Sequence, residues 1–179
     1  HKSAQTYNAY MLVRDKFDVN MDLIACLPDE TFEDFKRSVD IAVALNPANI
    51  TVHTLYMKKG SALKQGGYDN TDFETASKMV DYAYSKLTES GYEPYYMYRQ
   101  KYTSGNLENV GYAKPNKACI YNVDIMEEDT SIIANGANAI SKKWNKKLNL
   151  ITRCANYKEP LEYVKHIDEM LKRQHDFWL

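Results

Sequence analysis

Apolar and polar positions in the first half of the chain alternate between the spacing of strands and the spacing of helices. Two runs of strand length are almost continuously apolar, VNMDLIACL at 19–27 and NITVHTLYM at 49–57. Apolar residues recur at helical spacing in three further segments, 7–14, 32–43 and 73–87. The pattern predicts the order helix, strand, helix, strand, helix.

Two of the predicted helices carry start signals. Thr31 with Asp34 approximates a capping box, and Thr71 with Glu74 forms a regular one. Gly91 is the expected stop of the last of these helices. Apolar strands that alternate with helices are typical of a parallel sheet with helices on its outer face, so we expect an α/β fold. Because the chain opens on a helix with no strand before it, we expect it to begin inside a longer repeating βα pattern.

The second half of the chain, from residue 92, has a different character. Strand-like segments are separated by polar turns, and Pro160 then opens a final helix that runs through Leu171. The strand-like segments are 92–100, 117–127, 130–141 and 146–157. We therefore predict two domains, one over residues 1–91 and an α+β extension over residues 92–179.

Charge and hydropathy exclude several classes of partner. Lys and Arg number 23 against 24 acidic residues, and the net charge of -1 gives no electrostatic reason to expect nucleic acid or an anionic membrane as a partner. No apolar run approaches the roughly 20 residues that span a bilayer, and residues 1–15 lack the apolar core of a signal peptide. We expect a cytoplasmic protein.

The three cysteines are widely spaced. Cys26, Cys119 and Cys154 form no Cys-x-x-Cys pair, so the sequence predicts neither a disulfide framework nor a metal site. Cys26, at the end of a predicted strand, is expected to be a small buried hydrophobe rather than a reactive thiol.

Asp22 interrupts the first apolar strand. In parallel α/β folds ligands gather at the carboxyl ends of strands, and Asp22 lies near that end. Two readings stay open: a carboxylate satisfied by neighbouring backbone amides, which spacing alone favours, or a ligand-binding group. His53 on the second strand is similarly open between a satisfied core or edge histidine, the favoured reading, and a catalyst. Its partner cannot be read from the sequence.

Two long strings identify a resemblance. The segment VNMDLIACLPDETFEDFKRSVDIAVALNPANITVHTLYMKKGSAL, residues 19–63, resembles the oxygen-independent coproporphyrinogen III oxidase family of radical S-adenosylmethionine (SAM) enzymes. The segment YYMYRQKYTSGNLENVGYAKPNKACIYNVDIMEE, residues 95–128, is similar to the coproporphyrinogen dehydrogenase branch. The similarity runs from about residue 1 to residue 173.

The resemblance implies the carboxyl-terminal part of a partial (β/α) radical SAM barrel. Residues 1–91 would be its last βα units and residues 92–179 the family-specific α+β extension. In the family, a [4Fe-4S] cluster cleaves SAM, and the resulting radical starts the oxidative decarboxylation of coproporphyrinogen III to protoporphyrinogen IX. The family's CxxxCxxC cluster motif is absent from this sequence, so the cluster ligands are expected outside the chain, which alone is expected to be inactive.

The resemblance also implies cofactor contacts. Asp22 matches the strand aspartate that hydrogen-bonds SAM, plausibly at the ribose hydroxyls. Tyr56 falls where the next strand presents its backbone to the adenine. The GANAIS run, Gly136–Ser141, brings a small-residue turn near the adenosyl group, with Ile140 as the apolar contact.

The sequence departs from the family pattern at three turn positions. Cys26 and Asp29 replace the glycines of the usual GLPGET, which puts the close backbone approach there in doubt. Asn138 stands where a second glycine is common, although asparagine tolerates positive φ better than most residues.

The predicted loop at 98–118 offers candidate substrate contacts. A loop of about 20 residues is unusual in a compact domain, and its charged and amide side chains suit the propionates of a tetrapyrrole. The candidates are Arg99, Lys101, Asn106, Asn109 and Lys114. A simple solvated loop is the competing reading.

Three functions stay open at this point. The first is the carboxyl-terminal portion of a coproporphyrinogen dehydrogenase with a tetrapyrrole substrate, which the string NLENVGYAKPNKACIYN favours. The second is a haem-binding chaperone of the same superfamily, and the third is a non-catalytic structural domain. The sequence does not identify the electron donor.

Overall fold

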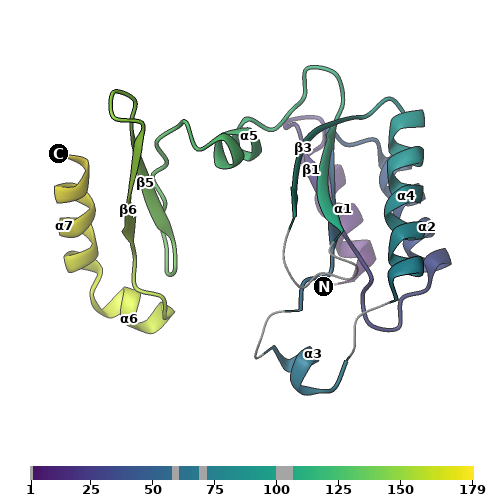
Figure 1. Ribbon diagram of the computed structural model, residues 1–179, viewed down its shortest axis with the longest axis horizontal. Helices are drawn as coiled ribbons and strands as arrows, with labels where there is room; N and C mark the ends of the chain where they lie inside the picture. The colour runs from purple at the N-terminus through teal and green to yellow at the C-terminus, as the bar shows by residue number, and fades with distance from the viewer. Residues whose placement is uncertain (1, 58–60, 69–71, 100–106) are drawn as a thin grey trace. The chain divides into compact units, whose positions relative to one another are not determined.

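The computed structural model describes residues 2–57, 61–68, 72–99 and 107–179. The chain divides into two compact units, His1–Ile120 and Tyr121–Leu179 (Figure 1). No helix in the part that the structure describes combines the length and apolar character needed to cross a bilayer.

The first unit is a mixed α/β structure, as the hydrophobic pattern predicts. Its elements are α1 (Ser3–Val13), β1 (Asn20–Ala25), α2 (Phe32–Leu45), β2 (Asn49–Thr54), α3 (Ala62–Gln65), α4 (Phe73–Glu89), β3 (Glu93–Arg99) and β4 (Glu108–Ala113). The four strands form one sheet in the order β1-β2-β4-β3. β1 and β2 are parallel, whereas β4 runs antiparallel to both of its neighbours. Among the described residues β1 pairs on one side only, so it is an edge strand.

β4 corrects the predicted loop at 98–118. The segment ENVGYA pairs with β2 on one side and with β3 on the other, so it is a central strand. Its polar residues and Gly111 weaken the strand signal in the local sequence. The neighbouring strands β2 and β3 supply the backbone hydrogen bonds that make this segment a strand. β3 and β4, both beyond residue 92, thus complete the sheet of the first unit rather than forming a separate body.

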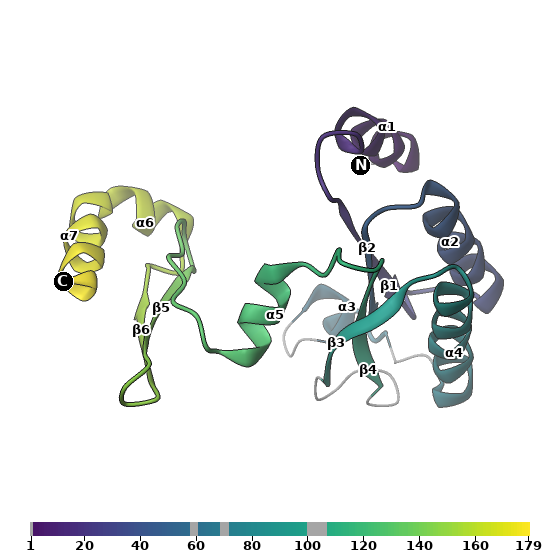
Figure 2. The ribbon, with the colours of Figure 1, turned by 90° about the horizontal axis from the view of Figure 1, so that it is seen from above.

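α2 and α4 cover one face of the sheet. Figure 2 shows both helices on the same side of the strands, where they pack on each other and on β1 and β2. The core between them is mainly apolar, and removal of this apolar surface from water is the main stabilising term of the unit. Its buried members include Ala25, Phe35, Val39, Ile50, Val52, Met79, Ala83, Leu87, Tyr92 and Tyr112. Cys26 is buried in this core, with its Sγ 3.8 Å from the sulfur of Met79.

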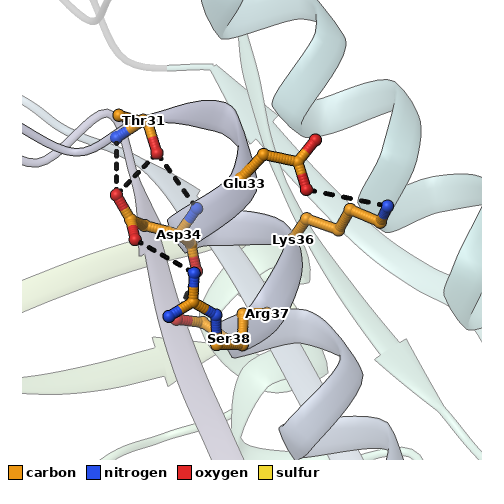
Figure 3. Close-up of polar contacts among 6 residues, drawn as sticks. All are labelled: Thr31, Glu33, Asp34, Lys36, Arg37 and Ser38. Atoms are coloured by element: carbon orange, nitrogen blue, oxygen red, sulfur yellow. Dashed lines mark hydrogen bonds and ion pairs between the residues drawn. The ribbon is translucent and has the colours of Figure 1, made fainter.

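The start of α2 is a complete capping box, as predicted (Figure 3). The Thr31 hydroxyl accepts a hydrogen bond from the Asp34 amide at 3.2 Å, and the Asp34 carboxylate accepts from the Thr31 amide at 3.2 Å and from its hydroxyl at 2.6 Å. These hydrogen bonds satisfy amides that have no partner within the helix. They lower the pKa of the Asp34 carboxyl, first through the Thr31 hydroxyl and then through its amide.

The start of α4 differs by one residue from the prediction. Asp72 is the N-cap, and its carboxylate accepts from the Thr75 amide at 2.9 Å. Asp72 is as good a cap as threonine, so the pattern fits either register. Thr71 lies outside the described residues.

Left-handed backbone occurs where the family pattern has glycine. Cys26 has φ 68° and Asp29 φ 60° in the turn after β1, and Asn138 has φ 61° in the second unit. The chain therefore keeps the backbone shape of these turns without the glycines, at some conformational cost. In the same turn Glu30 accepts from the Leu27 amide at 3.1 Å.

The second unit contains one hairpin and three short helices. α5 (Ile120–Glu127) leads into it, β5 (Ile140–Asn145) and β6 (Leu150–Ala155) pair antiparallel, and α6 (Pro160–Lys165) and α7 (Ile167–Trp178) follow. Pro160 at the start of α6 is as predicted, but the final helix is interrupted at His166.

Two strand predictions in this unit are wrong. Residues 117–127 contain helix α5, because this segment has no strand partner among the described residues and a helix pairs its backbone groups internally. In residues 130–141, regular strand begins only at Ile140, and Ile132 makes an isolated bridge to Lys142.

Candidate functional site

The sheet face opposite α2 and α4 carries polar side chains from three strands. Side chains alternate along a strand, so residues two positions apart share a face. On β2, Thr51 and His53 alternate with the core residues Ile50 and Val52. On β1, Asn20 and Asp22 alternate with Met21 and Leu23, which pack against the core. We call these six residues the polar face: Asn20 and Asp22 on β1, Thr51 and His53 on β2, and Tyr96 and Tyr98 on β3.

Asp22 is the group on which the polar face converges. Its side chain is 61% exposed. Its Oδ1 accepts a hydrogen bond from Asn20 Nδ2 at 2.8 Å and lies 3.6 Å from His53 Nε2. Side chains, not neighbouring backbone amides, are therefore its partners. Within the described residues, the second oxygen, Oδ2, has no hydrogen-bond partner.

A first series of hydrogen bonds reaches Oδ1 of Asp22 from Tyr96. Thr51 donates its single hydroxyl proton to Asn20 Oδ1 at 3.1 Å. The Tyr96 hydroxyl lies 3.3 Å from Thr51 Oγ1, and it must be the donor there because the threonine proton is already used. Donation thus runs from Tyr96 through Thr51 and Asn20 to Asp22.

A second series of contacts reaches Oδ1 of Asp22 from Tyr98, through one contact at hydrogen-bond distance and one approach of 3.6 Å, which is longer than a hydrogen bond. The Tyr98 hydroxyl lies 3.2 Å from His53 Nδ1, on the opposite side of the imidazole from Asp22. An ionised carboxylate only accepts, so the His53 nitrogen that faces it, Nε2, carries hydrogen. In a neutral imidazole Nδ1 is then the acceptor for Tyr98.

Gly111 makes room for the tyrosines. β4 lies between β2 and β3, so Tyr96 and Tyr98 must reach across it to meet Thr51 and His53. A Cβ at Gly111 would stand 1.9 Å from Tyr96 Cε1 and 2.4 Å from its Cδ1, which no side chain can do. The two rings lie parallel, with centroids 6.4 Å apart and 3° between their planes. The glycine therefore permits the close approach of ring to backbone.

Both phenols are held in the neutral, hydrogen-donating form. Burial raises the pKa of Tyr98 above its ordinary value, with smaller contributions from Tyr96 and Asp22. Burial also raises the pKa of Tyr96. Near neutral pH both hydroxyls can serve as donors.

The other predicted cofactor residues lie apart from this network. Tyr56 follows β2 and is 41% exposed. Ile140 opens β5 in the second unit, where it is 47% exposed and paired in register with Ala155. The turn before it contains Gly136 at φ 104°, a conformation open mainly to glycine. Their roles toward a cofactor stay predictions.

The three predicted substrate residues that the structure describes do not form one cluster. Arg99 makes an ion pair with Glu108 at the end of β3. Asn109 is buried on β4, where its Oδ1 accepts from the Thr54 amide at 2.8 Å while its Nδ2 has no partner among the described residues. Lys114 follows the other end of β4 and donates to the Asn46 carbonyl oxygen at 3.1 Å, and burial lowers its pKa. Lys101 and Asn106 lie outside the described residues.

The donor set does not fit an iron–sulfur cluster. Such a cluster needs several thiolates close together. The three cysteines form no disulfide, two of them are buried in different units, and no three His, Cys, Asp or Glu side chains in the described ranges gather as a metal site would require.

Sequence reasoning missed four members of the polar face. It singled out Asp22 and His53 but not Asn20, Thr51, Tyr96 or Tyr98. A signal was present, since polar residues two positions apart recur on three strands, in the triplets NMD, TVH and YMY. Such pairs meet only if their strands are neighbours in the sheet, and the local sequence does not show the strand order.

Comparison with known proteins gives two matches, although no family model matches the chain. The chain is 39% identical over 180 residues to the oxygen-independent coproporphyrinogen-III oxidase-like protein HemZ of Bacillus subtilis, covering 96% of this chain and 36% of that protein. Its fold matches the coproporphyrinogen III oxidase HemN of Escherichia coli, a radical SAM enzyme, with a TM-score of 0.64 and 19% identity over 94% of this chain and 38% of that one.

The chain thus spans somewhat more than a third of each of these proteins. The fold match confirms the predicted class, an α/β structure that forms part of a radical SAM fold. The resemblance inferred from the sequence is confirmed as well: this chain is a homologue of an oxygen-independent coproporphyrinogen III oxidase-like protein over nearly its whole length.

Proposed function

We propose that this chain is the part of a radical SAM enzyme that helps to bind SAM for the oxidative decarboxylation of coproporphyrinogen III in haem biosynthesis. The observation that carries the proposal is the free oxygen of Asp22. A carboxylate that is exposed, fixed through one oxygen and unpartnered at the other among the described residues is a ready acceptor for a sugar hydroxyl. The relatives' names supply the reaction class.

Each cofactor contact has its own role in the proposal. Asp22 Oδ2 accepts a ribose hydroxyl, the backbone near Tyr56 meets the adenine edge, and Ile140 packs against the adenosyl group. SAM, when bound, supplies the radical chemistry that oxidises the substrate. In this proposal the residues of this chain orient the nucleoside, and the cluster ligands belong to residues outside it, because the described residues gather no metal-binding group.

The substrate would be a tetrapyrrole that carries propionates. Arg99 and Lys114 are the described cations proposed for them, with Lys101, Asn106 and Asn109 as further candidates. Arg99 would have to exchange Glu108 for a propionate, which is a swap of one carboxylate partner for another.

The test is the Asp22→Asn variant of the full-length protein. The amide keeps the size of the side chain but replaces one charged acceptor oxygen, so we expect SAM affinity to fall about tenfold to a hundredfold with the fold unchanged. Equilibrium dialysis with radiolabelled SAM measures this directly. Asp81→Asn, an exposed aspartate on α4 beside Ser77, is the matched control and should bind as the unmodified protein does.

Unchanged SAM affinity in Asp22→Asn would overturn the proposed contact. The reaction itself is tested by anaerobic turnover of coproporphyrinogen III, with carbon dioxide release as the readout. Stoichiometric haem binding without carbon dioxide release would assign the protein to haem carriage instead.

A further inference from the structure

We infer that His53 and Tyr98 are positioning residues that fix the rotation of the Asp22 carboxylate and so set its selectivity for a ligand hydroxyl. The inference rests on the proposed function of Asp22 as a hydroxyl acceptor and adds how that acceptor is oriented.

The first step is that two donors share one oxygen. Asn20 Nδ2 and His53 Nε2 both face Oδ1 of Asp22, at 2.8 and 3.6 Å. An exposed carboxylate on a single strand would otherwise rotate about χ2, because that torsion is broad. Donors on two different strands oppose this rotation from two directions, so Oδ2 keeps one direction.

The second step is that His53 is itself held. Rotation of the imidazole by 180° would place carbon atoms where the nitrogens face Asp22 and Tyr98. The Tyr98 hydroxyl at 3.2 Å from Nδ1 fixes the ring orientation, and the Asp22 carboxylate on the other side of the ring favours the tautomer that carries hydrogen on Nε2. Tyr98 therefore acts on Asp22 only through His53.

The third step is that Tyr98 is held by its neighbour. Its ring lies parallel to that of Tyr96, which occupies the space above Gly111. Tyr96 also begins the other series of hydrogen bonds, through Thr51 and Asn20. Both series end on the same carboxylate oxygen, which is the arrangement expected of supports for a binding group.

The experiment measures hydroxyl selectivity in the full-length protein. Dissociation constants are determined for S-adenosylhomocysteine and for its analogues that lack the 2′- or the 3′-hydroxyl, and their ratio is the readout. A residue that only stabilises the fold changes all of these constants together, whereas a positioning residue changes their ratio. Thermal unfolding of each variant is recorded alongside.

The variants differ by single groups. We expect Asp22→Asn to lose most of the selectivity, and Tyr98→Phe and His53→Leu to lower it about two- to tenfold. His53→Gln retains an N–H donor near the Nε2 position and should recover most of the loss. Tyr121→Phe, which removes a hydroxyl from an exposed side chain of α5, is the matched control and should leave the ratio unchanged.

Two outcomes overturn different statements. If Asp22→Asn lowers the selectivity while Tyr98→Phe and His53→Leu do not, the positioning role is wrong and the proposed function stands. If Asp22→Asn leaves the selectivity unchanged, the proposed contact of Asp22 fails and the positioning role fails with it. Should His53→Leu fail to fold, Tyr98→Phe, which removes one oxygen atom, decides the question.

Discussion

The two units of this chain differ in how much of their apolar surface they bury. The first unit has a continuous core between its sheet and α2 and α4. Among the described residues of the second unit, the buried apolar side chains are Cys154 and Met170. Large apolar side chains are instead exposed there: Ile133, Leu148, Leu161, Val164 and Leu171 are each more than 60% accessible.

Most of the stability of the chain resides in the first unit. Burial of apolar surface is the dominant favourable term in folding, and a hairpin with three short helices offers little of it. The first unit therefore carries both the core and the polar face. The apolar surface of the second unit is of the kind that packs against further protein.

The largest expected effect comes from separating the units. We expect residues 2–120 alone to unfold in one cooperative thermal transition and residues 121–179 alone to show none, because the latter lack a core. Circular dichroism during heating measures both. A sharp transition in the isolated second unit would show that the hairpin and helices stabilise one another more than their burial indicates.

Matched leucine substitutions test the contrast in the intact chain. Leu87→Ala, at a fully buried position on α4, should lower the free energy of unfolding by about 2–5 kcal/mol. Leu161→Ala, at a position 84% exposed on α6, should change it by less than about 0.5 kcal/mol. Urea unfolding gives both values. Equal effects would mean that Leu161 is covered by other protein.

Gly111→Ala tests the packing of the polar face. The new methyl group must displace the Tyr96 ring, so we expect a loss of about 1–3 kcal/mol of unfolding free energy. Adding Tyr96→Ala should relieve the clash, so the double variant should lose less than the sum of the two single variants. Additive losses would contradict the contact between the ring and Gly111.

The smallest effects concern two glutamates whose pKa values move in opposite directions. In the first unit burial raises the pKa of Glu30, and in the second unit Lys142 first, and then Arg153, lower the pKa of Glu128. A raised pKa gives stability that is present below the unfolded value near 4.5 and lost as pH rises through the folded value. A lowered pKa gives stability that is present above 4.5 and lost as pH falls.

The two glutamine variants should therefore change the pH dependence of stability with opposite signs. As the pH rises from 4 to 7, the free energy of unfolding of Glu30→Gln should increase relative to that of the parent protein, by less than about 1 kcal/mol. The free energy of unfolding of Glu128→Gln should decrease relative to that of the parent protein over the same range. Urea midpoints at the two pH values measure the change, and a shift of the same sign in both variants would contradict the assigned causes.

Much of the first unit could be predicted from local sequence. β1, α2, β2 and α4 follow from apolar spacing and cap residues, because these elements bury a face whose period is visible in the chain. β4 could not, since its glycine and polar residues are explained only by the strands and rings beside it. α5 was misjudged because its β-branched residues suit a strand as well as a short helix.

The candidate site was predictable only at its centre. Asp22 stood out as a charge in an apolar run. The hydrogen bonds that support it join residues 31 or 45 positions apart in sequence, and those from the two tyrosines depend on β4 entering the sheet between β2 and β3. Local pattern predicts which face a residue occupies, but strand order decides which residues share it.

The crossing of β4 also has a consequence for the order of folding. The Asn20–Thr51 contact needs only the β1-α2-β2 crossover to close, a separation of 31 residues. The Thr51–Tyr96 and His53–Tyr98 contacts each span 45 residues and need α4, β3 and β4 in place. Loop closure over longer separations costs more entropy and comes later. We therefore expect Asp22 to contact Asn20 early in folding, and His53 to reach its final orientation only after β3 and β4 have joined the sheet. A newly made chain would then form its core before its binding geometry.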